Sequence, residues 1–151
     1  MEASKIDFSK IADPAMVAFP SIGKFDWGYV SVAEAQKQPL PFEVKRVFWT
    51  YYTPNEITRG QHSHYALHQM LVAVAGTIHI ELENLKGPQP DAVLDHPSKG
   101  LHLPPMCWTK IHFSHNAVLM SLCSMPYTES DYIRSYDEFL ALRTAYRAQL
   151  S

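Results

Sequence analysis

The chain has 151 residues, of which 46% are hydrophobic and 19% are charged. This length suits a single domain, and this composition excludes an intrinsically disordered chain. The net charge of −2 gives no basic surface for nucleic acid, so we expect no nucleic-acid partner. Cys107 and Cys123 are too few for a disulfide framework or a cysteine metal knuckle, and we expect buried free thiols.

The N-terminal region carries no recognisable targeting or membrane signal. No apolar run reaches the length of about 18 residues that a membrane-spanning helix needs, and the start lacks the charged-then-apolar layout of a signal peptide. We therefore expect no membrane contact and a cytoplasmic protein. Residues 1–151 are expected to form one domain, with residues 1–15 as a loosely held N-terminal arm.

Short strands are predicted in the first half of the chain. Aromatic and β-branched residues predict a strand at 45–53. Alternating polar and apolar residues predict two strands within 69–83, on either side of Gly76. The turn-rich stretch 84–91 is expected to be a loop, and a further strand is expected to begin at Ala92.

Further strands are predicted in the second half. Residues 100–113 predict two strands separated by Pro104 and Pro105, and residues 116–124 predict a strand that is buried on both faces. Six to eight short strands with no helix between them are typical of an all-β sandwich or barrel. A parallel sheet with crossover helices is therefore not expected.

The C-terminus is different and predicts a helix over residues 135–150. Ser135 and Glu138 have the spacing of a capping box. Apolar side chains then recur at helical spacing, at Phe139, Leu142, Tyr146 and Leu150. We expect this helix to pack against the β-structure.

The stretch RGQHSHYALHQ, residues 59–69, places three histidines within seven positions. On a strand, residues two apart share a face, so His62 and His64 point to the same side. They either meet in a pocket or form an exposed polar face. His68 is expected to face away from its neighbour Gln69 and to have no catalytic role.

The spacing of His62, His64, Gln69 and Gly76 resembles the first cupin motif, in which two histidines and a glutamate bind a metal. Here the glutamate position holds Gln69, and a neutral amide is a poor ligand for a divalent cation. A metal site would also need a further histidine, for which His112 is the candidate. We therefore predict no metal and no other cofactor.

Three separated motifs resemble the nucleotide-sugar 3,4-ketoisomerases of the cupin superfamily. PFEVKRVFWTYYTPNEITRGQHSH (41–64) is similar to the family's PF-x-KRVF-Y followed by RG-x-HAH. GLHLPPMCWTKIHFS (100–114) is similar to GL-x-I-x-P-x-x-W followed by FS. YTESDYIRSYDEFL (127–140) is similar to Y-x-E-x-DYIR-x-Y-x-EFL. The three motifs occur in the family's order, and this makes the resemblance specific.

The resemblance implies an all-β fold, namely a small cupin-type β-barrel (jelly roll) with a C-terminal helix, in a homodimer. It also implies an isomerase that moves the keto group of dTDP-4-keto-6-deoxyglucose from C4 to C3 without a metal. Its product would supply the biosynthesis of a dTDP-linked 3-amino-3,6-dideoxyhexose. The chain departs from the family at Ser63, at Trp27 where arginine is common, at Thr109, and in the longer stretch 84–91.

The chemistry of this reaction assigns roles to the histidines. A ketone moves to the neighbouring carbon when a proton leaves C3 and another arrives at C4, through an enediol. Histidine has a suitable pKa for both transfers. We predict His62 and His64 as the catalytic acid and base; we favour His64 as the base, although the sequence does not separate the two.

The remaining site residues are predicted to bind substrate. Arg59, Gln69 or Tyr51 is expected to stabilise the enediolate oxygen, and Arg59 also to contact the diphosphate or the sugar hydroxyl groups. Trp108 is expected to line the pocket. Two other hypotheses stay open: a metal-dependent cupin enzyme with His112 as a ligand, and a non-catalytic nucleotide-sugar-binding module.

Overall fold

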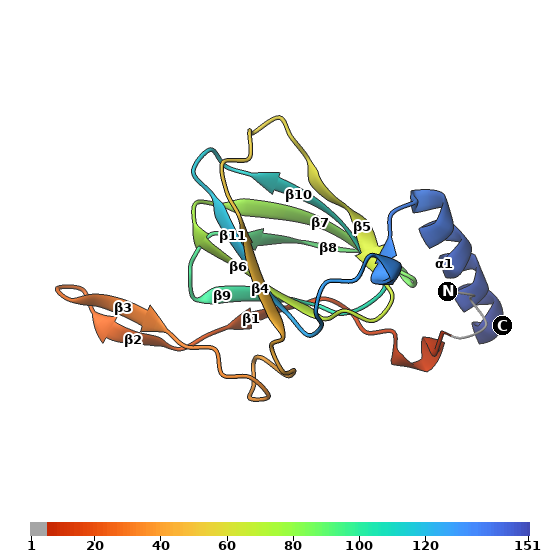
Figure 1. Ribbon diagram of the computed structural model, residues 1–151, viewed down its shortest axis with the longest axis horizontal. Helices are drawn as coiled ribbons and strands as arrows, with labels where there is room; N and C mark the ends of the chain where they lie inside the picture. Colours follow the sequence, from red (N-terminus) through yellow and green to blue (C-terminus); the bar gives the residue numbers. More distant parts are fainter. Residues whose placement is uncertain (1–5) are drawn as a thin grey trace.

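The computed structural model describes residues 6–151. Two five-stranded antiparallel sheets form the body, a hairpin projects from it, and one helix lies at the C-terminal end (Figure 1). The strands are β1 (Ala15–Ala18), β2 (Ser21–Lys24), β3 (Gly28–Ser31), β4 (Arg46–Thr50), β5 (Arg59–His64), β6 (Gln69–Ala75), β7 (Ile78–Asn84), β8 (Gly87–Leu94), β9 (Lys99–Leu103), β10 (Cys107–Phe113), β11 (Val118–Cys123) and β12 (Tyr132–Ile133). The sheets have the orders β1-β9-β6-β11-β4 and β12-β5-β10-β7-β8.

The main core lies between the two sheets. Along β7, the side chains of Ile78, Ile80 and Leu82 are buried, while His79 and Glu81 alternate with them on the outer face. Leu71 of β6 belongs to the same buried cluster from the opposite sheet. Each sheet thus buries one face, as an all-β sandwich requires. The sheets do not close into one barrel, so the expected fold class is confirmed in the form of a jelly-roll sandwich.

The prediction of a loop over 84–91 is wrong. The chain turns at Leu85 and Lys86, and β8 begins at Gly87, so a tight β7–β8 hairpin replaces the loop. The turn-forming prolines of this stretch are tolerated because β8 is an edge strand, where a missing backbone N–H breaks no sheet ladder. The other predicted strands occur close to their expected ranges.

The predicted C-terminal helix is confirmed as α1 (Tyr136–Leu150). The Ser135 hydroxyl accepts a hydrogen bond from the Glu138 backbone N–H and caps its first turn. The helix packs on the outer side of the second sheet and forms a second buried cluster with Trp108. Its buried residues are Phe139, Leu142 and Tyr146. In residues 6–151 no helix is both long and apolar enough to cross a membrane.

The described part of the predicted N-terminal arm, residues 6–15, makes two specific contacts with the body. Phe8, in a short 3-10 helix, is buried edge-on against Tyr146 of α1 at a centroid distance of 5.7 Å. The Asp13 carboxylate accepts a hydrogen bond from the Asn84 side chain at 2.9 Å. The ring is buried and the carboxylate is hydrogen-bonded, so both contacts hold the segment to the body. Residues 1–5 lie outside the described part of the chain.

The β2–β3 hairpin extends away from the sandwich (Figure 1). Its large side chains are exposed, to 91% at Phe25 and 84% at Trp27. Ile22, Tyr29 and Val30 are also exposed. The hairpin therefore leaves most of its large apolar side chains exposed. It was not among the strands predicted from the sequence.

Candidate functional site

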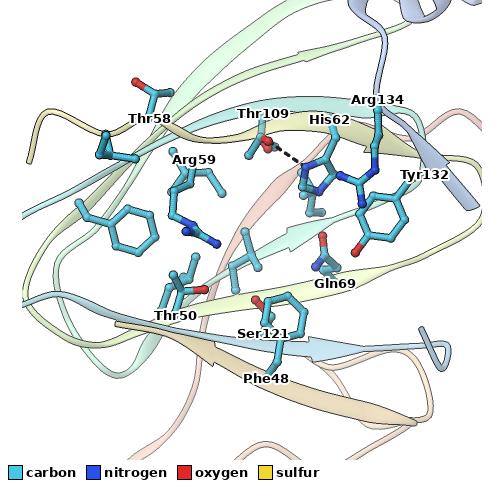
Figure 2. Close-up of a pocket in the computed structure, with 17 residues that line it drawn as sticks. Phe48, Thr50, Thr58, Arg59, His62, Gln69, Thr109, Ser121, Tyr132 and Arg134 are labelled. Atoms are coloured by element: carbon cyan, nitrogen blue, oxygen red, sulfur yellow. Dashed lines mark hydrogen bonds between the residues drawn. The ribbon is translucent and has the colours of Figure 1, made fainter. Parts of the chain in front are cut away.

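A cavity of about 430 Å³ opens between the two sheets, next to β4, β5 and β12. Apolar side chains of both sheets form part of its wall, among them Phe48 and Leu71 of the first sheet and Ile111 of the second. Its polar lining consists of Thr50, Thr58, Arg59, His62, Gln69, Thr109, Ser121, Tyr132 and Arg134 (Figure 2).

A β-bulge in β5 brings Arg59 and His62 into this cavity together. On a regular strand, residues three apart point to opposite faces. Here Thr109 of β10 pairs with His62 and the next residue of β10 pairs with Gly60, so Gln61 is an extra, unpaired residue. The bulge restores both side chains to one face, and Figure 2 shows them pointing into the same space.

Gly60 is required at this bulge. Its φ is 78°, in the left-handed region that glycine adopts without strain. A Cβ atom at this position would lie 2.7 Å from Thr109 Oγ1 and 2.9 Å from the Thr109 carbonyl oxygen. The close approach of β5 to β10 therefore excludes any side chain at Gly60.

The surroundings of His62 determine which ring nitrogen carries the hydrogen and keep the ring neutral. Its Nδ1 lies 2.9 Å from the Gly60 carbonyl oxygen (dashed in Figure 2), and because this oxygen can only accept, Nδ1 carries the hydrogen. Nε2 then holds a free lone pair. Burial lowers the pKa of His62 to about 4, so the ring is neutral at pH 7. A neutral imidazole with a free Nε2 in a cavity is a proton acceptor.

His64 lies behind the cavity wall. It shares a face with His62, as predicted, and the two rings meet edge-on at a centroid distance of 5.0 Å. Only 6% of His64 is exposed, and it is absent from the cavity lining. Its Nδ1 is 3.2 Å from the Asp131 carboxylate. Of the two histidines, His62 is the one that faces the cavity.

Gln69 lines the cavity across from His62 (Figure 2). Its side-chain amide makes one long contact, 3.9 Å, to the Cys123 sulfur. His68 faces away from Gln69, as expected for adjacent strand residues, and its Nδ1 lies 3.1 Å from His102 Nε2 on the outer side. Gln69 thus retains hydrogen-bonding capacity toward the cavity.

Two predicted binding residues lie outside the cavity. Trp108 points to the opposite face of β10 from Thr109 and packs under α1 against Phe139, so the prediction that it lines the pocket is corrected. Tyr51 follows the lining residue Thr50, is 54% exposed and stacks edge-on against its neighbour in sequence. In both cases the alternation of strand side chains decides the direction.

Two lining residues were not among the predicted site residues. Tyr132 and Arg134, which lie in the DYIR part of the third motif, both line the cavity. Tyr132 pairs with His64 in the β12–β5 ladder, while Arg134 is held over the Tyr132 ring at 4.2 Å. Hydrogen bonds from Arg134 lower the pKa of Glu129 to about 2. Their spacing in the DYIR motif, two apart like the histidines, was the available signal.

His112 cannot complete a metal site with His62 and His64. It points to the outer face of β10, where its Nε2 lies 2.6 Å from the Glu81 carboxylate. In the part of the chain that the structure describes, residues 6–151, no group of three or more His, Cys, Asp or Glu side chains is placed to hold a metal ion. The metal hypothesis therefore lacks its predicted third ligand.

The sandwich with a histidine-lined cavity between its sheets defines a small cupin-type jelly roll. The family model described as FdtA (WxcM-like, C-terminal) matches residues 12–144, so the chain belongs to this family. A TDP-4-oxo-6-deoxy-alpha-D-glucose-3,4-oxoisomerase of Aneurinibacillus thermoaerophilus is 37% identical over 140 residues, which cover 92% of this chain and 91% of the relative.

Solved structures agree with this assignment. QdtA, a sugar 3,4-ketoisomerase of Thermoanaerobacterium thermosaccharolyticum in complex with TDP, has a TM-score of 0.81 and 33% identity over 87% of this chain and 95% of its own. A histidine-to-asparagine mutant of QdtA in complex with TDP-4-keto-6-deoxyglucose has a TM-score of 0.80 and 32% identity, and covers 89% of this chain and 96% of its own. A 3,4-ketoisomerase of Helicobacter canadensis has a TM-score of 0.81 and 32% identity over 87% and 98% of the two chains.

We predict that Gly60→Ala destabilises the protein more than Gly28→Ala. Both replacements place alanine at a positive φ, which costs about 1–2 kcal/mol. A Cβ at Gly28 meets nothing within 4 Å, whereas a Cβ at Gly60 overlaps Thr109. Urea denaturation of the two variants measures the difference. Equal losses of unfolding free energy would show that β5 and β10 do not approach as closely as described.

Proposed function

We propose that this chain is a metal-independent 3,4-ketoisomerase that converts dTDP-4-keto-6-deoxyglucose to the 3-keto sugar. The proposal depends mainly on His62, a neutral imidazole whose Nε2 lone pair faces a cavity large enough for a sugar. The relatives described above, named for this isomerisation, supply the substrate class. The product has the ketone at the carbon where an aminotransferase would place the amine of a 3-amino-3,6-dideoxyhexose.

In the proposed mechanism the base is His62, which lines the cavity, and not His64, which the sequence favoured. His62 Nε2 removes the proton from C3 of the bound sugar. The C3–H electron pair forms the C3–C4 double bond, and the former C4 carbonyl oxygen becomes an enediolate oxygen. The imidazolium then returns its proton to C4. Because the catalyst gives back the proton it takes, the ring ends neutral and ready for another turnover.

The oxygens must exchange a proton as well, since the hydroxyl at C3 becomes a carbonyl and the carbonyl at C4 becomes a hydroxyl. A group that can both donate and accept is needed there, and the Tyr132 hydroxyl in the cavity lining can do both. Of the three candidates for stabilising the enediolate oxygen, Arg59 and Gln69 line the cavity and Tyr51 does not, and the Gln69 amide is the donor we favour.

The two cavity-lining arginines suit the nucleotide diphosphate. Arg59 and Arg134 supply planar guanidinium groups that form paired hydrogen bonds with phosphate oxygens. Glu129 holds Arg134 by hydrogen bonds to both Nε and Nη2 and so orients it at the cavity. The apolar part of the wall, with Phe48 and Leu71, suits the thymine ring and the C6 methyl group of the sugar.

We predict that His62→Asn abolishes turnover while His112→Gln leaves it unchanged. Loss of the base should reduce the rate by about 100-fold or more. NMR in deuterated water follows entry of solvent deuterium at C3 and formation of the 3-keto sugar, trapped by a partner aminotransferase. His112 is a matched control because it lies outside the cavity and pairs with Glu81.

The same assay separates the alternative hypotheses. A metal-dependent cupin enzyme would lose activity after treatment with a chelator and regain it with the metal, whereas the proposed enzyme keeps full activity. A non-catalytic binding module would bind the dTDP-sugar without deuterium exchange. Either result with the unmodified protein would contradict the proposal.

The pH dependence of kcat/KM should report the low pKa of His62. The neutral ring is the base, so protonation removes activity. Because burial lowers the pKa of His62 to about 4, activity should stay level as the pH falls from 7 to 5 and decline only near pH 4. A decline centred near 6.5, the ordinary histidine value, would show that His62 is not the essential base. Circular dichroism at each pH confirms that the fold persists.

We further propose a cytoplasmic homodimer in which the β2–β3 hairpin packs on a second copy of the chain. A contiguous projection of exposed apolar side chains marks an interaction surface. A second copy is the occupant we favour because the hairpin and the exposed outer side of β4, with Trp49, together offer two apolar faces per chain. The buried free thiols Cys107 and Cys123 suit a reducing compartment.

We predict that Val30→Lys weakens the dimer and that Val93→Lys does not. Both valines are exposed, but Val30 lies on the hairpin and Val93 on the edge strand β8. Light scattering should give twice the chain mass of 17.2 kDa for the unmodified protein and for Val93→Lys, with a shift toward the single mass for Val30→Lys. A single chain mass for the unmodified protein would reject the dimer.

A further inference from the structure

Asp131 stands at the junction between the C-terminal segment and β5. Its side chain is buried, with 8% exposed, directly before the cavity-lining Tyr132. The carboxylate accepts hydrogen bonds from the Ala66 backbone N–H at 2.8 Å and from the Leu67 backbone N–H at 3.3 Å. Its Oδ2 is also 3.2 Å from Nδ1 of His64. Every one of these partners belongs to β5 or the turn that follows it.

The contact with Asp131 decides which nitrogen of His64 carries the hydrogen. A carboxylate oxygen accepts, so Nδ1 of His64 donates and Nε2 is left with a lone pair. That Nε2 is buried and, within residues 6–151, has no hydrogen-bond partner. Buried polar atoms without partners are rare in folded proteins and point to a functional constraint.

The His64 ring lies directly against two cavity-lining side chains. Its centroid is 4.3 Å from that of Tyr132 and 5.0 Å from that of His62. A fixed orientation of His64 therefore also fixes the rings that face the substrate. The carboxylate that orients His64 acts on the site without touching the cavity itself.

We propose that Asp131 is a positioning residue: it holds His64 in the tautomer that leaves Nε2 without hydrogen, in a ring that lies against the cavity-lining rings of His62 and Tyr132. This inference rests on the proposed function and adds to it a role for a residue outside the cavity. In this arrangement Gly60 orients His62 through its carbonyl, and Asp131 orients His64 through its carboxylate. Both imidazoles then carry hydrogen on Nδ1 and present Nε2.

The variant Asp131→Asn tests this role because an amide has only one accepting oxygen. In Asp131, Oδ1 accepts from Ala66, and Oδ2 accepts from His64 and Leu67. In asparagine the NH2 group must replace one of these two oxygens. With the oxygen kept on Ala66, the amide donates to His64 and moves its hydrogen to Nε2. The lone pair of Nε2 is then lost although the volume of the side chain is unchanged.

Two measurements are made on the full chain, on Asp131→Asn, on His64→Gln and on the double variant. Long-range proton–nitrogen NMR reads the tautomer of His64, and steady-state kinetics reads kcat and KM. We expect hydrogen on Nδ1 in the unmodified protein and on Nε2 in Asp131→Asn, with a loss of kcat and little change in KM. The double variant should be no slower than His64→Gln alone.

Ser130→Ala is the matched control, since Ser130 lies in the same turn and is exposed, and within residues 6–151 its hydroxyl bonds only Thr128. It should keep both the tautomer and the rate. If Nε2 of His64 carries the hydrogen in the unmodified protein, the proposal is wrong. This measurement does not depend on whether any variant folds. A double variant much slower than His64→Gln also overturns it, because Asp131 would then act on the turn and not through His64. Absence of turnover in the unmodified protein rejects the proposed function instead, and the tautomer still tests the role of Asp131.

Discussion

The close approach of β5 to β10 at Gly60 is the constraint on which the site depends. At this point the Thr109 side chain and carbonyl occupy the space of a Cβ atom, so only glycine fits at position 60. The extra residue at Gln61 then rotates the strand and aims Arg59 and His62 into one cavity. The same local geometry brings the Gly60 carbonyl to Nδ1 of His62 and leaves its Nε2 as an acceptor. One backbone irregularity thus sets both the position and the protonation of the residue that we propose as the base.

The C-terminal segment completes the site from the other side. β12 adds to the edge of β5 by pairing Tyr132 with His64, which places Tyr132 and Arg134 at the cavity. The following helix is anchored by its own apolar face and by a hydrogen bond from Tyr65 to Glu138. Because the helix holds the end of β12, the packing of Phe139 contributes to the placement of cavity residues that it does not touch.

Five of the eight histidines of this chain illustrate three kinds of environment. His62 is buried and neutral because desolvation lowers its pKa to about 4. His79 and His112 stack on the outer face of the second sheet, each next to a carboxylate. His68 and His102 form a half-buried pair whose pKa values are lowered chiefly by burial. Residue type alone therefore does not identify a site; the facing of the strand and the partner of each nitrogen do.

The sequence by itself determined the strand pattern, the C-terminal helix and the shared face of His62 and His64, because strand alternation and helical spacing are local properties. The three motifs also indicated the family. Only the tertiary structure decided that His62 faces the cavity and His64 lies behind it, since both share a face of β5 and the neighbour that contacts His64, Asp131, is distant in the sequence. The packing of Trp108 under α1 and the position of Arg134 at the cavity likewise depend on which elements cover each face of a sheet. Such contacts join residues far apart in the chain, and no local pattern encodes them.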